Sequence, residues 1–304
     1  MLAFYMKKLV VRISEGLGNQ FFMYANAYSL SKKLGYELFI DNHSAYKKVK
    51  IRSFLLDQFK IESKFINPSE SPNNLFNYLI YKINKKTDAL RSKKKFIIER
   101  KYLKKSTKYE NYSNLSFDDT IFVEGYFESE KYFKEYKSDI KRQFQIKHIN
   151  LDDLFLNPNQ IRNENSVSIA IRQHRFSEKQ KDKISIEKSN LFVKNTIRYI
   201  YKAIEVMKSK IENPKFYIFS NDTANLQNFF PVHENFIIIN HLANKPLNDF
   251  YLSTLCKHYI VGPSTFHWWS AYLNENQKKI CICPTEDLKF SSNINIYPEE
   301  WVKL

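Results

Sequence analysis

Short apolar runs typical of buried strands alternate along most of the chain with longer runs of helical periodicity. The first elements predicted are a strand at 8–13, a turn at 14–20, an amphipathic helix at 21–34 that Gly35 ends, and a strand at 37–40. This strand–helix–strand order is typical of a doubly wound α/β domain with a parallel sheet.

A second series of the same kind follows the polar, asparagine-rich stretch 156–165, which we interpret as a linker. Its predicted strands lie at 166–171, 215–219, 236–239 and 259–261, and its predicted helices at 195–208, 247–256 and 266–273. A chain of 304 residues is long for one hydrophobic core. We therefore expect two Rossmann-like domains, residues 1–155 and 156–304.

The chain is strongly basic, with 48 lysines and arginines against 32 acidic residues and a net charge of +16. Such a charge permits nucleic acid, an anionic membrane or a phosphorylated substrate as partner. Part of it lies in the less regular segment 60–115, at Lys93, Lys94, Lys95, Arg100, Lys101, Lys104 and Lys105. These residues form either a solvated face or a surface for anionic lipid or a phosphorylated acceptor. No zinc-finger or RRM signature occurs, so a basic nucleic-acid-binding protein is kept only as the alternative from another class.

The three cysteines, Cys256, Cys281 and Cys283, are too few for a disulfide framework and lack the spacing of a metal site. We interpret them as core thiols in a reducing cytosol. Residues 1–6 make a poor signal peptide, and no apolar run approaches the roughly 18–20 residues of a membrane span. We expect a cytoplasmic protein, or one bound peripherally at the inner face of the bacterial plasma membrane.

Residues 262–273 combine small hydroxyl residues with two of the chain's three tryptophans. Ser264 and Thr265 lie where a predicted strand ends and a helix begins, a place where N–H groups and the helix dipole favour an anion such as phosphate. The same pattern also suits a simple helix cap, with Trp268 and Trp269 as core residues.

Polar segments follow three predicted strands of the second half, at the sheet edge where α/β proteins bind ligands. The segments are Arg172–Arg175, Ser220–Asp222 and Pro263–Thr265. A guanidinium suits a diphosphate, an aspartate can accept hydrogen bonds from a base or ribose, and hydroxyls can donate to phosphate oxygens. Together they predict a nucleotide-diphosphate site, although each alone could be an ion pair, a turn or a cap.

The turn that contains Gly16 and Gly18 is neither a dinucleotide fingerprint nor a Walker loop. Phe21 stands where the fingerprint has its third glycine, and no Gly-Lys-Ser/Thr follows. The turn offers close approach of the backbone to a ligand, with Asn19 as a donor or a helix cap.

At Glu15–Ala25 the chain resembles the G-G-L-G-N-Q opening of the bacterial α-1,2-fucosyltransferases of glycosyltransferase family 11. The resemblance continues in the same order at 125–133, 219–222, 250–258 and 264–269. It implies a GT-B fold with an interdomain cleft, and inverting transfer of L-fucose from GDP-L-fucose to the 2-hydroxyl of a sugar, often galactose. The acceptor would belong to a surface glycan such as O-antigen, lipopolysaccharide or capsule. No cofactor and no essential metal are expected.

The residues and the resemblance together nominate a set of site positions. Donor-binding positions are Gly16, Leu17, Gly18, Asn19, Arg172, His174, Ser220, Asp222, Ser264, Thr265 and Phe266; acceptor-binding positions are Tyr126, Phe127 and Glu128; catalytic positions are Arg172 and Glu15. Arg172 matches the family's arginine for the donor diphosphate. Glu15 is the first choice of general base, with Glu128, His174 or a phosphate oxygen as alternatives.

The chain departs from the family pattern in one segment. The family usually reads His-x-Arg-Arg-Gly-Asp-Tyr, whereas this chain reads Ala170-Ile171-Arg172-Gln173-His174-Arg175-Phe176, and His267 replaces a usual serine. The retained Arg172 still predicts diphosphate binding. The changes leave open a transferase that uses another GDP-sugar, or a catalytically silent relative.

Overall fold

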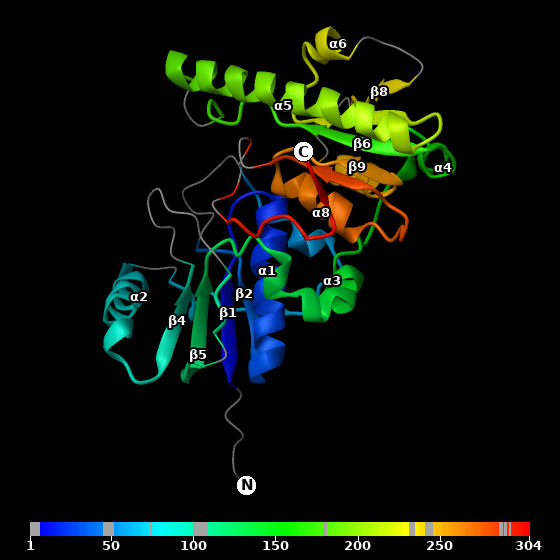
Figure 1. The fold of residues 1–304 in the computed structure, drawn as a ribbon. Coiled ribbons are helices and arrows are strands. Elements are labelled where there is room, and N and C mark those ends of the chain that lie inside the picture. The colour runs from blue at the N-terminus through cyan, green and yellow to red at the C-terminus, as the bar shows by residue number, and fades with distance from the viewer. Residues whose placement is uncertain are drawn as a thin grey trace. The chain divides into compact units, whose positions relative to one another are not determined.

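The computed structural model describes residues 7–44, 52–72, 75–99, 109–112, 114–178, 181–230, 235–240, 246–285, 288, 291 and 293–304 (Figure 1). Residues 1–6 and the basic residues Arg100, Lys101, Lys104 and Lys105 lie outside these ranges. The chain divides into two compact units: Met1–Lys147 with Ser291–Pro298, and His148–Phe290 with Glu299–Leu304. The predicted functional roles of the two domains stay predictions.

The first unit is built on a five-stranded parallel sheet of order β3-β2-β1-β5-β4. Its strands are β1 (Lys8–Arg12), β2 (Glu37–Asp41), β3 (Lys64–Phe65), β4 (Lys94–Ile98) and β5 (Phe117–Glu124). Its α-helices are α1 (Leu17–Leu34), α2 (Leu75–Thr87) and α3 (Lys137–Gln143). Short 3₁₀ helices lie at Leu56–Gln58, Asp88–Leu90, Glu130–Tyr132 and Lys134–Tyr136.

The second unit is built on a six-stranded parallel sheet of order β11-β10-β9-β6-β7-β8. Its strands are β6 (Ser166–Ile171), β7 (Lys215–Ser220), β8 (Phe236–Ile238), β9 (His258–Ile260), β10 (Cys281–Cys283) and β11 (Val302–Lys303). Its α-helices are α4 (Pro158–Asn163), α5 (Lys183–Lys210), α6 (Leu226–Phe229), α7 (Pro246–Thr254) and α8 (Thr265–Leu273), and a 3₁₀ helix lies at Leu151–Asp153. The two parallel sheets with helices confirm the predicted α/β class.

Helix α1 begins earlier than the sequence predicts and is not amphipathic. It starts at Leu17, with Gly16 as N-cap, and 14 of its 18 residues are buried. Its outer side is covered as well, since Phe21 packs against the rings of Phe59 and Phe144. Gly35 ends the helix in the left-handed conformation, as predicted.

The stretch 156–165, which we interpret as a linker, contains the helix α4. Asn157 accepts a hydrogen bond from the N–H of Asn159, and Pro158 occupies the first turn. The side chain of Ile161 is fully buried. Asparagine followed by proline is a signal for the start of a helix as much as for a loop, and the apolar residue decides between them.

Two other helices differ from the sequence prediction. Helix α5 starts at Lys183 rather than residue 195, where the side chain of Asp182 accepts from the N–H of Ser185 at 3.0 Å. Helix α2 lies inside the segment 60–115 that the sequence left irregular. None of the described helices is long and apolar enough to cross a membrane.

The core of the second unit contains both tryptophans of α8. Trp268 and Trp269 are fully buried, and Trp268 stacks on Tyr272 at 4.7 Å between ring centroids. The three cysteines are also buried and unpaired, as predicted. Burial raises the pKa of Cys281 and of Cys283 to about 12, so both remain protonated thiols at neutral pH.

Candidate active site

The order of the second sheet brings together the predicted donor residues of the second half of the chain. Strand β6 lies at the centre of this sheet, with β7 on one side and β9 on the other. The strands that follow β6 in the sequence are therefore added first on one side of it and then on the other, so the strand order reverses at β6. In such sheets ligands bind outside the carboxyl ends of the strands at this reversal. The polar segments that follow β6, β7 and β9 all lie at this edge, as the sequence predicts.

Reciprocal hydrogen bonds join the loop after β6 to the loop after β7. The N–H of Gln173 donates to Oδ1 of Asn221 at 2.7 Å, and Nδ2 of Asn221 donates back to the carbonyl of Gln173 at 3.1 Å. Nε2 of Gln173 also donates to the carbonyl of Asp222 at 2.7 Å. Ser220 donates to the same carbonyl, so its hydroxyl shapes this turn.

His174 and Asp222 form a pair across these two loops. Nε2 of His174 lies 2.7 Å from Oδ2 of Asp222, and the N–H of Ala224 donates to Oδ1 at 2.8 Å. The hydrogen bond with His174, followed by that from Ala224, holds the pKa of Asp222 below its usual value. His174 has a φ of +57°, a left-handed conformation that costs a non-glycine residue roughly 1 kcal/mol or more.

Arg172 follows directly after β6 and is partly exposed. Its Nη2 donates to Oε1 of Glu178 at 2.7 Å. Its Nε is buried, and no group among the described residues accepts a hydrogen bond from it. A buried donor without an acceptor is costly in free energy, so this nitrogen is suited to an acceptor supplied by a ligand.

Arg175 connects the same loop to the junction between β9 and α8. Its Nη1 donates to the carbonyl of Pro263 at 3.2 Å. Its guanidinium lies over the ring of Phe192, 5.2 Å from the centroid. The side chain therefore has a cation–π support and a backbone partner in the neighbouring loop.

Gly262 permits the close approach of the β9–α8 junction to β6. A Cβ at this position would lie 2.1 Å from the carbonyl oxygen of Ala170 and 3.2 Å from its Cβ. Ser264 then occupies the N-cap of α8, but its hydroxyl makes no capping hydrogen bond. Ser264, Thr265 and Phe266 are half-buried at the start of the helix. The side-chain cap that the sequence offered as an alternative is therefore not formed by Ser264.

His267 points into the core beneath this junction. It is buried between Phe219 and Phe266, with ring centroids 6.1 and 5.8 Å away. Burial lowers the pKa of His267 to about 3, so the ring is neutral at physiological pH. This histidine packs as an uncharged ring.

The predicted glycine turn of the first unit is the start of α1. The side chain of Leu17 and the backbone of Gly18 are buried, whereas Glu15, Gly16 and Asn19 are partly exposed. Buried Gln20 fixes this start: Nε2 donates to the carbonyls of Glu15 and Ser53, and Oε1 accepts from the N–H of Leu55. Glu15 has a φ of +64°, so its position depends on this clamp.

A strained turn places Tyr126 after β5. Gly125 has a φ of +148° and Phe127 a φ of +52°. The carboxylate of Glu99 accepts hydrogen bonds from the N–H groups of Tyr126 and Phe127, at 2.7 and 2.9 Å. Phe127 is fully buried, whereas Tyr126 is half-buried, so of these two only the tyrosine presents its side chain at the surface.

Glu15, Tyr126 and Glu128 form an acidic and phenolic cluster in the first unit. Burial raises the pKa of Tyr126 to about 12, helped by the charges of Glu15 and Glu128 and by a hydrogen bond with Glu15. Glu128 is buried and accepts a hydrogen bond from the hydroxyl of Ser291. Glu128 thus anchors the segment Ser291–Pro298 to its unit, while Glu15 and Tyr126 remain nearer the surface.

Comparison with known proteins identifies the chain. A family model described as "Glycosyl transferase family 11" matches residues 8–304. The chain belongs to glycosyltransferase family 11. It is 28% identical to an α-1,2-colitosyltransferase of Escherichia coli and 25% identical to the O-antigen biosynthesis glycosyltransferase WbnK of Escherichia coli. The alignments cover 98% and 96% of this chain and 99% of each relative.

Solved structures agree with the GT-B fold expected of this family. The fucosyltransferase NodZ from Bradyrhizobium superposes with a TM-score of 0.52 and 13% identity, over 87% of this chain and 92% of that chain. A variant of FUT1 from Arabidopsis thaliana in complex with GDP also gives a TM-score of 0.52 and 13% identity, over 91% and 70% of the two chains. The predicted GT-B fold is confirmed, and the chain is a glycosyltransferase.

Sequence reasoning missed a charged cluster at the carboxyl edge of the first sheet of this glycosyltransferase. Arg12 and Asp41 are register partners at the ends of β1 and β2, and Glu124 ends β5. Lys85 forms an ion pair with Glu124. Burial raises the pKa of Glu124 and lowers that of Lys85, and the charge of Arg12 also lowers the latter. Charged residues at or beside the ends of predicted strands were the available signal.

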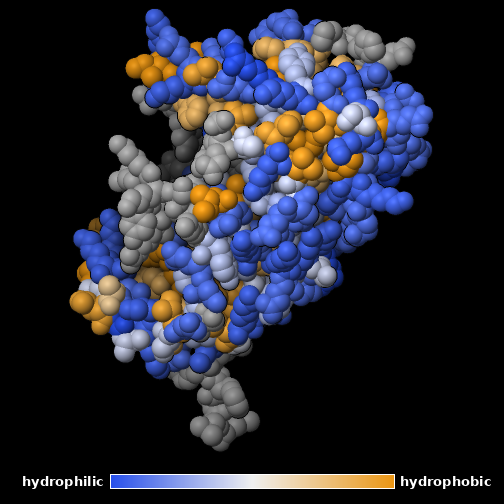
Figure 2. All heavy atoms as spheres, viewed as in Figure 1, coloured by the Kyte–Doolittle hydropathy of each residue, from blue (hydrophilic) through white to orange (hydrophobic). Residues whose placement is uncertain are grey.

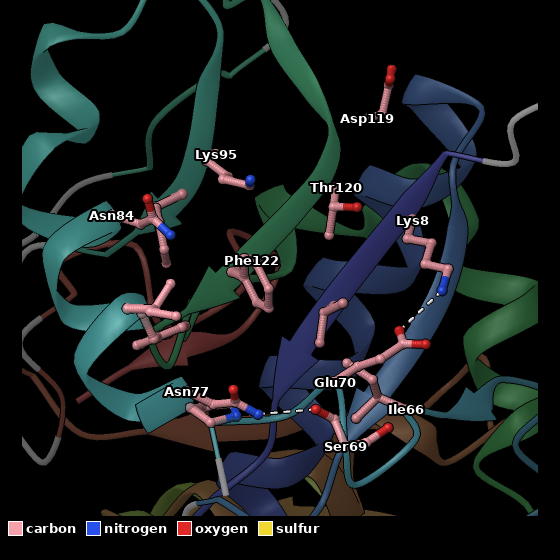
Figure 3. A pocket seen from close by; sticks show the side chains of 15 residues that line it. Lys8, Ile66, Ser69, Glu70, Asn77, Asn84, Lys95, Asp119, Thr120 and Phe122 are labelled. Carbon is pink, nitrogen blue, oxygen red and sulfur yellow. Dashed lines mark hydrogen bonds and ion pairs between the residues drawn. The ribbon is translucent and has the colours of Figure 1, made fainter. Parts of the chain in front are cut away.

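A groove of about 570 Å³ lies elsewhere in the first unit, between α2 and the sheet (Figure 3). Its polar lining includes Lys8, ion-paired with Glu70 at 3.0 Å, and Asn77, which donates to the carbonyl of Ser69. None of the nominated site residues lines it. Among the described residues, no group of three or more histidine, cysteine, aspartate or glutamate side chains could hold a metal ion.

The closeness of Gly262 to β6 gives a prediction about stability. Gly262→Ala should lower the free energy of unfolding by on the order of 3 kcal/mol, because backbone of β6 cannot move away from the new Cβ. Urea unfolding measures the change. Gly16→Ala is the matched control, since its Cβ would meet only Arg52 atoms at 3.8 Å. Equal stability of the two variants would contradict the close approach.

Proposed function

We propose that this glycosyltransferase transfers L-fucose, with inversion, from GDP-L-fucose to the 2-hydroxyl of a sugar in a surface glycan such as O-antigen. The observation that supports it best is the meeting of Arg172, the His174–Asp222 pair and the start of α8 at one sheet edge. A guanidinium, a carboxylate and a helix N-terminus suit the diphosphate and the nucleoside of such a donor. The names of the relatives favour the same class of reaction.

The proposed chemistry depends on stabilising the leaving diphosphate. Cleavage of the bond between sugar C1 and phosphate oxygen leaves negative charge on GDP and oxocarbenium character on the sugar. Arg172 would neutralise part of that charge, and the N–H dipoles at Ser264 and Thr265 would stabilise the rest. In this scheme cationic side chains and helix dipoles serve in place of an essential metal ion.

Two groups are candidates for the base that accepts the acceptor's proton. Glu15 is our first choice, because its carboxylate is partly exposed beside the hydroxyl of Tyr126. His174 is the second, because Asp222 holds one nitrogen of its ring, as a carboxylate orients a catalytic histidine. Tyr126 would then contact the acceptor sugar.

A second candidate function is transfer of colitose from its GDP derivative. It is favoured by the 28% identity to an α-1,2-colitosyltransferase over nearly the whole of both chains. Colitose lacks the 3-hydroxyl of fucose, so a site for it would bind a less polar sugar ring. A hydrogen-bonded hydroxyl that a site is built to bind discriminates strongly between such analogues.

Donor specificity tests the proposal directly. Purified protein should release GDP from GDP-L-fucose in the presence of a galactose-terminated acceptor, and the product should carry an α-1,2 linkage by NMR. Excess chelator should leave the rate unchanged. Turnover with GDP-colitose alone would select the second candidate, and no turnover with any GDP-sugar across a disaccharide panel would favour a silent relative.

Arg172→Ala should weaken GDP binding and reduce kcat/KM roughly 100- to 1000-fold, because the leaving diphosphate loses its cation. Calorimetry with GDP and steady-state kinetics measure the two effects. Arg162→Ala removes an exposed arginine from α4 and is the control for charge. Unchanged GDP affinity in Arg172→Ala would exclude the diphosphate role.

Glu15→Gln should lower kcat about 100-fold with little change in GDP affinity, because only proton transfer is removed. His174→Ala measured in parallel separates the two candidate bases. If Glu15→Gln retains its turnover and His174→Ala loses it, the histidine is the base. A fall in the GDP affinity of Glu15→Gln would instead indicate a donor-binding role.

A further inference from the structure

Helix α2 turns mostly polar residues toward its own unit and apolar residues outward, the reverse of an ordinary surface helix. The residues turned toward the unit are Asn77, Tyr81, Asn84 and Lys85, which are half-buried, and no residue of the helix is buried. The outward apolar residues are Leu75, Phe76, Leu79 and Ile83, with 75%, 71%, 50% and 61% of their surfaces exposed. A helix that contacts only its own unit normally has the opposite pattern.

Specific contacts fix this orientation. Tyr81 packs edge-on against the rings of Phe96 and Phe122, at 5.2 and 5.5 Å between centroids. Lys85 forms its ion pair with Glu124, and Asn84 accepts from Nη2 of Arg91 at 3.0 Å. The groove in Figure 3 lies under this inner side. Figure 2 shows apolar side chains at the surface where Figure 1 places α2.

The charge around the helix favours an anionic partner. The segment 75–95 contains seven lysines and arginines but a single acidic residue, Asp88, which is buried. Lys82 and Lys86 are exposed beside the apolar face, and Lys82 lies 4.7 Å from the ring centroid of Tyr78. Apolar residues bordered by lysines on one helix are typical of helices that lie in the surface of an anionic bilayer.

We propose that α2 is a membrane-docking helix, which inserts Leu75, Phe76, Leu79 and Ile83 among the lipids of an anionic bilayer while Lys82 and Lys86 contact the headgroups. The sequence indicates lipid contact only through the basic residues of the segment 60–115. The structure adds the exposed apolar face of α2, which insertion requires. The proposal is independent of the donor sugar, because the helix contains none of the nominated site residues.

Co-sedimentation of the full chain with vesicles tests this docking without any donor or acceptor. The protein should bind vesicles of phosphatidylcholine with phosphatidylglycerol more strongly than vesicles of phosphatidylcholine alone, and less strongly at high salt. The double variant Leu79→Ser, Ile83→Ser should bind vesicles at least about tenfold more weakly, because two inserted side chains are removed. Its thermal unfolding should be unchanged, because both side chains are exposed.

The matched control is the double variant Ile184→Ser, Leu191→Ser on α5, whose side chains are 63% and 59% exposed. It should bind vesicles like the unaltered protein. A second variant, Lys82→Gln with Lys86→Gln, should show a weaker preference for phosphatidylglycerol. Equal vesicle binding by the α2 variant and the unaltered protein would overturn the proposal. So would a dimer in solution that the α2 variant dissociates, because a second copy would then cover this face.

Discussion

The close packing of the β9–α8 junction on β6 is the constraint on which the candidate donor site depends. Gly262 leaves no room for a Cβ over the carbonyl oxygen of Ala170. This contact places the start of α8 beside the end of the central strand, where Arg172 begins the next loop. The tryptophans of α8 lock the helix into the core behind it. A rigid scaffold of this kind is what positions loop residues for binding.

The arrangement of the second unit could be predicted from the sequence because it follows from a general property of parallel sheets. Once 166–171 and 215–220 are recognised as strands, their carboxyl ends must share an edge. The contacts at that edge could not be predicted, since they depend on loop conformation. The pairing of His174 with Asp222 requires a left-handed φ that side-chain patterns do not encode.

In the first unit, the sequence was least informative where burial or polarity runs against the usual rules. Two glycines suggested a turn at 14–20, yet the chain is helical from Leu17 onward, because burial of Leu17 and the clamp of Gln20 outweigh the low helix propensity of Gly18. Helix α2 was missed because its apolar residues face outward. Periodicity alone says which residues share a face, but not which face meets the protein.

The altered segment after β6 is held together by contacts of its own. His174 occupies the position where the family usually has glycine, and its partner Asp222 offsets the strain of its backbone. Arg175 stands where the family has aspartate. It donates a hydrogen bond to the carbonyl of Pro263 and lies over the ring of Phe192. Random loss of a binding loop would leave such groups unpaired. Their mutual pairing favours a site whose shape is maintained by different side chains over a loop that has degenerated.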